Sequence, residues 1–223
     1  MTMWKRVLSV ILIAALGVSL CGCPPRPPKV NVNIGDEMTM GKYGNNPIEW
    51  IVLDMNDDGD ALVISKYILD MLPYNQDASA VTWEECWLRE WLNNEFYSTS
   101  FNKEEQNKIL TTKLKNPDNI AYGIPGGNDT SDKVFLLSYD EADSLFAGSK
   151  ERRAKPTSYA LDKGIMVSMK GSSEGCAPWW LRSPGRDVHS AVCVRDIGYI
   201  LNSGYNVYYE GYGVRPAMWV KLS

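Results

Sequence analysis

The feature that most constrains the fold is a row of tryptophans spaced by about one helical turn. Trp83, Trp87 and Trp91 recur at i, i+4 and i+8, the spacing that places side chains on one face of an α-helix. Thr82 and Glu85 have the spacing of a capping box, which marks the first turn of a helix. A helix with so wide an aromatic face must bury it, so we expect Trp83 and Trp91 in the core.

Other segments of the first half predict short strands and short helices. Residues 48–53 and 61–65 are rich in β-branched and large apolar residues, and they flank Asn56-Asp57-Asp58-Gly59, a pattern that predicts a hairpin. Two further capping boxes predict short helices over about 103–110 and 139–146.

The second half of the chain is rich in strand and turn signals. Residues 134–137 predict a strand, and from Trp179 onward short apolar segments are separated by glycines, which is typical of short strands joined by turns. The sequence therefore predicts an α+β fold. About 190 residues are enough for one domain with a core, which we place at residues 34–223.

The first 33 residues read as an export and anchoring segment. Lys5 and Arg6 precede an uncharged run over 7–20, which is 14 residues long and shorter than the ~20 of a membrane-spanning helix. The following Leu-Cys-Gly-Cys resembles the bacterial lipobox, which would make Cys23 the lipidated first residue of the mature chain. We expect a lipoprotein signal peptide over 1–22, and a lipidated Cys and Pro-rich tether over 23–33.

This segment predicts where the protein resides. A lipidated N-terminus would hold the chain to a membrane, so the expected localisation is the bacterial cell envelope, lipid-anchored and facing outside the cytoplasm. The alternative is a cleaved secretory signal in which Cys21 and Cys23 have no role.

Charge and cysteine content narrow the possible partners. The chain has 23 Lys plus Arg against 27 Asp plus Glu, a net charge of −4, with no basic cluster that could neutralise a phosphate backbone, so we expect no nucleic-acid partner. Once Cys23 is acylated, Cys86, Cys176 and Cys193 remain in the domain. Two interpretations stay open: one disulfide, first of all between Cys176 and Cys193, or three buried free thiols.

Five motifs in order carry a resemblance to known proteins: 47–54 (PIEWIVLD), 82–97 (TWEECWLREWLNNEFY), 126–138 (GGNDTSDKVFLLS), 179–185 (WWLRSPG) and 213–217 (GVRPA). They resemble a family of bacterial surface domains of unassigned function within the C-type-lectin-like superfamily. That superfamily also holds the formylglycine-generating enzymes and the variable proteins of diversity-generating retroelements. The resemblance covers about residues 34–222. It implies a C-type-lectin-like fold with short helices packed on small, mainly antiparallel twisted sheets, and it implies no particular activity.

Metal and cofactor chemistry is not expected. Asp54, Asn56, Asp58 and Asp60 mimic the start of a calcium loop, but its closing acid would fall on Ser65, so we interpret the segment as an acidic turn. The triplets of calcium-dependent lectins are absent, and 127–129 (GND) is only a fragment of that pattern whose side chains would cap or pin a loop. We therefore predict no metal and no cofactor.

A catalytic function is also not expected. The resemblance would require a closely spaced cysteine pair for formylglycine chemistry, whereas Cys176 and Cys193 stand 17 residues apart. His189 is the only histidine, and Ser190 is its neighbour in the sequence. Adjacency in the sequence, without a third group to orient the histidine, does not indicate a nucleophilic triad. An enzyme of the sulfatase-modifying type and a structural envelope protein remain as alternatives.

The composition of residues 186–212 points instead to recognition. Tyrosine mixed with Asn, Ser and Gly is typical of binding surfaces, because tyrosine offers a large contact area and a hydrogen bond at small entropic cost. The alternative is that the tyrosines merely cover a twisted sheet. The candidate ligand-binding residues are His189, Arg195, Tyr199, Asn202, Tyr205, Asn206, Tyr208 and Tyr209, and the expected structural framework is Trp83, Trp91, Trp180, Arg182, Arg215 and Trp219.

These predictions combine into one hypothesis. The chain is expected to be a cell-surface lipoprotein that acts as a non-catalytic ligand-binding module. Its expected partners are the membrane, through the N-terminal lipid anchor, and an extracellular glycan or protein ligand. If the segment 186–212 is a recognition face, Tyr199, Tyr205 and Tyr208 should be exposed on one side of the C-terminal sheet.

Overall fold

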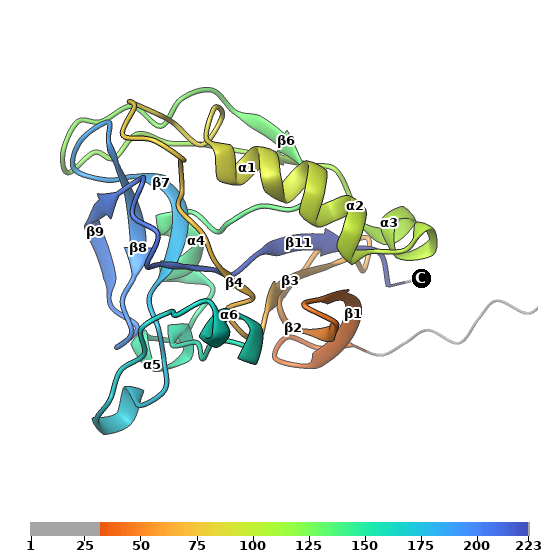
Figure 1. Cartoon of the computed structure of the whole chain (residues 1–223). Coiled ribbons are helices and arrows are strands. Elements are labelled where there is room, and N and C mark those ends of the chain that lie inside the picture. Colours follow the sequence, from red (N-terminus) through yellow and green to blue (C-terminus); the bar gives the residue numbers. More distant parts are fainter. Residues whose placement is uncertain (1–31, 223) are drawn as a thin grey trace, which may run out of the picture.

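The structure, a computed structural model, describes residues 32–222, and its first sheet is built around the predicted hairpin (Figure 1). Strands β2 and β3 pair antiparallel on either side of a turn in which Asn56 Oδ1 accepts a hydrogen bond from the Asp60 backbone nitrogen at 2.8 Å. The sheet has the order β1-β2-β3-β11, with strands β1 (Glu37–Tyr43), β2 (Asn46–Met55), β3 (Ala61–Ser65) and β11 (Ala217–Val220). The last strand of the chain thus returns to the N-terminal sheet.

The second sheet contains the glycine-punctuated strands that follow Trp179. Its order is β4-β10-β7-β8-β9, and every pair is antiparallel except β10 with β7. Its strands are β4 (Asp70–Met71), β7 (Trp179–Pro184), β8 (Ser190–Val194), β9 (Ile200–Asn206) and β10 (Gly213–Val214), and a separate small ladder joins β5 (Thr112–Leu114) to β6 (Thr130–Asp132).

Short helices cover these sheets, which makes the protein α+β. Helix α1 (Trp87–Trp91) continues through a π-helical turn (Leu92–Phe96) into α2 (Tyr97–Ser100), and Figure 1 shows the three as one helix. The other helical segments are α3 (Lys103–Lys108), α4 (Tyr139–Ser144), α5 (Ser149–Arg152), α6 (Ser158–Asp162) and a 3₁₀ turn (Gly171–Ser173). The capping boxes predicted for α3 and α4 both form, although each helix ends about two residues earlier than expected.

The capping box predicted at Thr82 is wrong. Helix α1 begins at Trp87, and its N-cap is Cys86, whose sulfur accepts from the Arg89 backbone nitrogen at 3.4 Å. The Thr82 carbonyl instead accepts from the backbone nitrogens of Glu85 and Cys86, at 3.3 and 3.0 Å. These bonds close a turn before the helix, so Trp83 lies outside the helix on which the sequence pattern placed it.

Trp83 and Trp91 are nevertheless buried. Trp83 Nε1 donates to Asp132 Oδ2 at 2.9 Å, and the same carboxylate pairs with Arg89 Nε at 2.7 Å. Trp87 is half-buried and stacks on Trp91, with ring centroids 6.4 Å apart. The tryptophan row therefore packs into the core from a turn and a helix rather than from one continuous helix.

The predicted strand over 134–137 is also wrong. The segment is buried, but among its residues only Phe135 forms a β-bridge, to Ala217. Side chains bond to much of the remaining backbone: Asn93 Nδ2 donates to the Val134 carbonyl at 2.9 Å, and Arg182 Nη1 donates to the Leu136 carbonyl at 2.8 Å. Because side chains take these carbonyls, no neighbouring strand is needed to satisfy them.

Arg215 lies at the junction of the two sheets, between β10 and β11, and it is fully buried without a carboxylate partner among the described residues. Its Nε donates to the Ser65 carbonyl at 2.8 Å, and its guanidinium carbon lies 5.0 Å from the Trp179 ring centroid and 5.5 Å from that of Phe146. Burial lowers the pKa of this guanidinium to about 9. Carbonyl and aromatic contacts thus hold the charge where the two sheets meet.

Unlike Arg215, the buried Arg182 pairs its charge with a carboxylate. Its guanidinium forms a two-pronged ion pair with the Glu141 carboxylate of α4, and it also donates to backbone carbonyls of Leu136 and Lys115. The pair fastens α4 to β7, since a bidentate arginine–carboxylate contact fixes geometry as well as charge.

Among residues 32–222, Cys86, Cys176 and Cys193 are buried free thiols, so the disulfide between Cys176 and Cys193 is not formed. Within the same range, no three His, Cys, Asp or Glu residues are grouped so that they could hold a metal ion. None of the helices in that part of the chain has the length and apolar character needed to cross a membrane. The signal peptide, Cys23 and most of the tether lie outside the described residues.

Candidate functional site

The candidate site is built by strand β9 and the loop that follows it. A bulge shifts the register of β8 against β9, so that Ala191 pairs with Tyr205 and Cys193 pairs with Leu201. The chain then turns at Val207, which is buried and bonded on both sides: its nitrogen donates to the His189 carbonyl at 2.9 Å and its carbonyl accepts from Asn75 at 2.8 Å. This anchored turn leads into the run of tyrosines.

Three tyrosines pack into one cluster on top of a buried tryptophan. The ring centroids of Tyr205 and Tyr209 are 4.7 Å apart, those of Tyr205 and Tyr212 5.2 Å, and those of Tyr209 and Tyr212 5.4 Å. Tyr212 is buried and lies 4.7 Å from Trp180, whose indole nitrogen donates to the Leu72 carbonyl at 3.0 Å. The core thus supports the outer rings from below.

Two open hollows adjoin this cluster and share the side chains of Met166 and Tyr209. One has a volume of about 360 Å³ and the other about 450 Å³. Gly211 lies between them, and a Cβ there would come within 2.6 Å of the Tyr209 ring, so a larger residue would displace that ring from its present position. We call this surface the tyrosine groove, and we define it by Met71, Met166, Arg195, Tyr205, Tyr208, Tyr209 and Tyr212.

The groove offers apolar contact and hydrogen-bonding groups. Burial raises the pKa of the Tyr212 hydroxyl above its usual value, and burial raises the pKa of the Cys193 thiol beneath it to about 12. Both groups are therefore neutral near pH 7. Arg195, Asp196 and Glu210 bring charges of both signs to the hollows.

The three tyrosines on which the recognition hypothesis depends are exposed. Tyr199, Tyr205 and Tyr208 expose 57%, 41% and 47% of their surface. Tyr205 and Tyr208 line the two hollows, but Tyr199 lies at the β8–β9 turn, lines neither hollow and makes no ring contact with the other described aromatic side chains. The tyrosines are thus accessible, and two of the three gather at the groove.

The remaining candidate residues are divided among several places. Arg195 and Tyr209 line the groove, and Asn206 is exposed at the end of β9. His189 lies outside the groove, with Nδ1 2.8 Å from the Ala78 carbonyl, and Asn202 lines a different hollow. Sequence proximity within 186–212 therefore does not bring all of these residues into one site.

The residues expected to form the framework are more uniform in burial. Trp180, Arg182 and Arg215 are buried, whereas Trp219 in β11 is only half-buried. Trp180 alone lies directly beneath the groove, through its contact with Tyr212.

Sequence reasoning missed Met71 and Met166, which come from distant parts of the chain. The stretch 164–169 carries two exposed methionines, Met166 and Met169, within a segment that forms neither helix nor strand. Apolar residues in such a loop are the one signal that could have indicated a contact surface there.

Residues 58–222 match the family model of a domain of unknown function, DUF6273. No curated protein and no solved structure matches the chain. The matched region contains the hairpin strand β3, the tryptophan helix, both buried arginines and the tyrosine groove. The match spans well over half of the length of the chain. The chain therefore belongs to the DUF6273 family of domains of unknown function.

Proposed function

We propose that the protein is a lipid-anchored recognition module of the bacterial cell envelope, with a C-type-lectin-like fold, that binds its ligand through the tyrosine groove without catalysing a reaction. The observation that carries this proposal is the tyrosine cluster seated on Trp180, in which Tyr212 is buried and Tyr205 is exposed. Rigidly supported aromatic side chains concentrate binding energy, because they lose little entropy on contact.

The position of the groove supports an outward-facing site. Val32, where the described chain begins, and Leu222, where it ends, line one hollow together with residues of β1. Figure 1 shows β9 at the opposite end of the molecule from this region. An anchor that precedes Val32 would therefore leave the tyrosine groove on the side away from the membrane.

The fold assignment within the proposal is supported by where the resembling motifs fall. WWLRSPG coincides with β7 and the residue after it, and GVRPA joins β10 to β11, the connection between the two sheets. The two motifs thus form a central strand of the second sheet and the link between the two sheets.

The anchor is tested by detergent partitioning of two cysteine variants. Because acylation needs the Cys23 thiol, we expect Cys23→Ser to move the protein out of the detergent phase, whereas Cys21→Ser should behave like the wild type. Equal partitioning of the two variants would overturn the lipobox assignment.

A further inference from the structure

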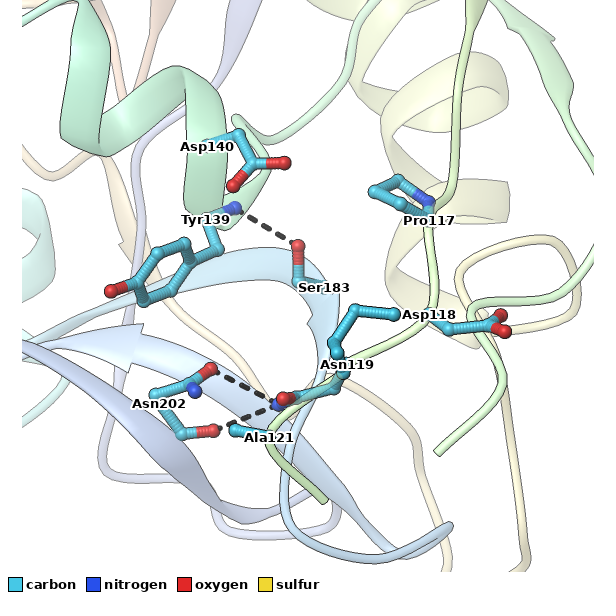
Figure 2. Close-up of a pocket in the computed structure, with 9 residues that line it drawn as sticks. Pro117, Asp118, Asn119, Ala121, Tyr139, Asp140, Ser183 and Asn202 are labelled. Carbon is cyan, nitrogen blue, oxygen red and sulfur yellow. Dashed lines mark hydrogen bonds between the residues drawn. The ribbon is translucent and has the colours of Figure 1, made fainter. Parts of the chain in front are cut away.

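Another hollow, separate from the tyrosine groove, lies between α4, strand β9 and the loop over 117–121, and Figure 2 shows the side chains that line it. Its volume is about 250 Å³, enough for one small ligand but smaller than the pockets that take drug-sized molecules. In Figure 2 the Asp140 carboxylate and the Pro117 ring face each other across this space, with Asn119 and Asn202 along another side.

The wall formed by the loop is fixed before any ligand binds. The Asn119 amide is buried, and its Nδ2 lies within hydrogen-bonding distance of Asn202 Oδ1, at 3.0 Å, and of the Pro184 carbonyl, at 2.8 Å. The Asn119 backbone bonds to Ile124 across the loop. On the opposite wall, the Tyr139 nitrogen donates to Ser183 Oγ at 2.9 Å and thereby holds the start of α4. A preorganised wall lowers the entropic cost of binding.

Several polar groups of the hollow are left without a protein partner. Because Asn202 Oδ1 accepts from Asn119, its Nδ2 is the free end of the amide and carries two N–H donors. Within residues 32–222, neither this nitrogen nor the Asp140 carboxylate forms a hydrogen bond or ion pair. Ser183 Oγ accepts one bond and keeps its own hydrogen to donate.

The charge of the hollow selects against anions. No Lys or Arg lines it, and its two acids are Asp118 and Asp140. Asp118 Oδ1 accepts from the Gly126 nitrogen at 3.0 Å, and Figure 2 shows its carboxylate directed away from the hollow. Asp140 is therefore the acceptor that a ligand would meet.

The remaining surface of the hollow is apolar. Pro117 and Ile120 line it, and Ile120 is 86% exposed, so its side chain is accessible to a ligand in the hollow. The lining thus combines one strong acceptor, two kinds of donor and a small apolar surface.

We propose that this hollow binds the acetamido group of a small uncharged ligand, independently of the tyrosine groove. The amide N–H would donate to the Asp140 carboxylate, the amide carbonyl would accept from Asn202 Nδ2, and the methyl group would pack on Pro117 and Ile120. This pairing satisfies a donor and an acceptor of the ligand at the same time, and it leaves no buried charge of the ligand unpaired.

Saturation-transfer NMR on the full chain in detergent tests the proposal with two probes that share the acetamido group, N-acetylglucosamine and N-acetylalanine amide. We expect transfer to the acetyl methyl of at least one probe, and the pair distinguishes an amino sugar from an acylated amino acid as its source. Glucose and lactamide, which are uncharged and carry a hydroxyl in place of the acetamido group, should show at least tenfold less transfer.

Two variants locate the binding. Asp140→Asn and Asn202→Asp should each weaken binding of the responsive probe at least tenfold, whereas Tyr208→Ser, in the tyrosine groove, should leave it unchanged. Because the Asp140 side chain is exposed and unbonded among the described residues, Asp140→Asn should keep the wild-type denaturation midpoint. The proposal is overturned if neither probe shows transfer, if glucose responds as strongly as N-acetylglucosamine, or if binding survives both variants.

Discussion

Arg182 and Tyr208 both belong to the C-terminal half of the fold, but their polar groups are satisfied in opposite ways. The Arg182 guanidinium is buried and bonded to a carboxylate and to carbonyl oxygens, so each contact ties together elements distant in the sequence. The hydroxyls of Tyr205, Tyr208 and Tyr209 form no hydrogen bond to any described residue. A buried group that is already bonded contributes to stability, whereas an exposed ring with a free hydroxyl is available to a ligand.

This comparison assigns stability to the buried framework residues and ligand recognition to the tyrosine groove. Substitutions can test both assignments. Framework variants should change the free energy of unfolding. Variants of the exposed groove residue Tyr208 should leave it nearly unchanged.

The largest effect is expected from Arg215→Ala. The substitution removes the bond to the Ser65 carbonyl and empties the space between Trp179 and Phe146, so the free energy of unfolding should fall by about 3–5 kcal/mol in urea denaturation. Arg186→Ala is the matched control, because Arg186 is exposed, and it should cost less than about 0.5 kcal/mol. Equal midpoints for the two variants would show that Arg215 does not join the sheets.

A loss of similar size is expected when a core tryptophan is removed. Trp83→Ala or Trp91→Ala should each cost about 3–5 kcal/mol, because both rings are buried. The half-buried Trp87 offers the comparison: Trp87→Ala should cost less than either. A denaturation midpoint that Trp91→Ala leaves unchanged would contradict the burial of the row.

An intermediate effect is expected at the ion pair beneath α4. Glu141→Gln keeps the shape of the side chain but leaves the buried Arg182 charge without its counter-ion, so it should cost about 1–3 kcal/mol, reduced because Glu141 is partly exposed. Asp143→Asn changes the same helix at an exposed pair with Arg152, so its cost should stay below about 0.5 kcal/mol. A larger loss for Asp143→Asn would reverse this part of the comparison.

The parts of the fold that could be predicted from sequence are those with a local physical cause. The hairpin between β2 and β3, and the capping boxes at Asn102 and Ser138, depend on residues within a few positions of one another. The Thr82 box has the same local pattern and fails, because the Thr82 carbonyl closes a turn and Cys86 caps the helix instead. The burial of Trp83 was predicted correctly even though its helix was not, since burial depends on the side chain rather than on the backbone around it.

The candidate site was predictable only in part, for a physical reason. Tyr205, Tyr208 and Tyr209 stand close together in the sequence and meet at the groove, but Met166 and Met71 reach it through tertiary contacts that no local pattern records. Asn202 also comes from the tyrosine-rich stretch, yet it lines the hollow beside α4. It stands three residues before Tyr205, an odd spacing that places strand residues on opposite faces, and the β-bulge also falls between the two. Assigning strand residues to a face requires the register, and the bulge changes the register.

The central claim is tested most directly by binding of the full chain, in detergent, to a glycan and peptidoglycan array. The wild type is compared with a double variant, Tyr205→Ser with Tyr208→Ser. The urea denaturation midpoints of both proteins are measured alongside. We expect the wild type to bind defined spots. The double variant should bind these spots at least tenfold more weakly, since contact tyrosines contribute about 1–3 kcal/mol each to binding. Its free energy of unfolding should fall by about 1–3 kcal/mol, because Tyr205 loses its ring contacts with Tyr209 and Tyr212, and the variant should remain folded. Binding that the double variant retains, or a loss of binding that unfolding of the variant accounts for, would contradict the assignment of the tyrosine groove as a recognition surface.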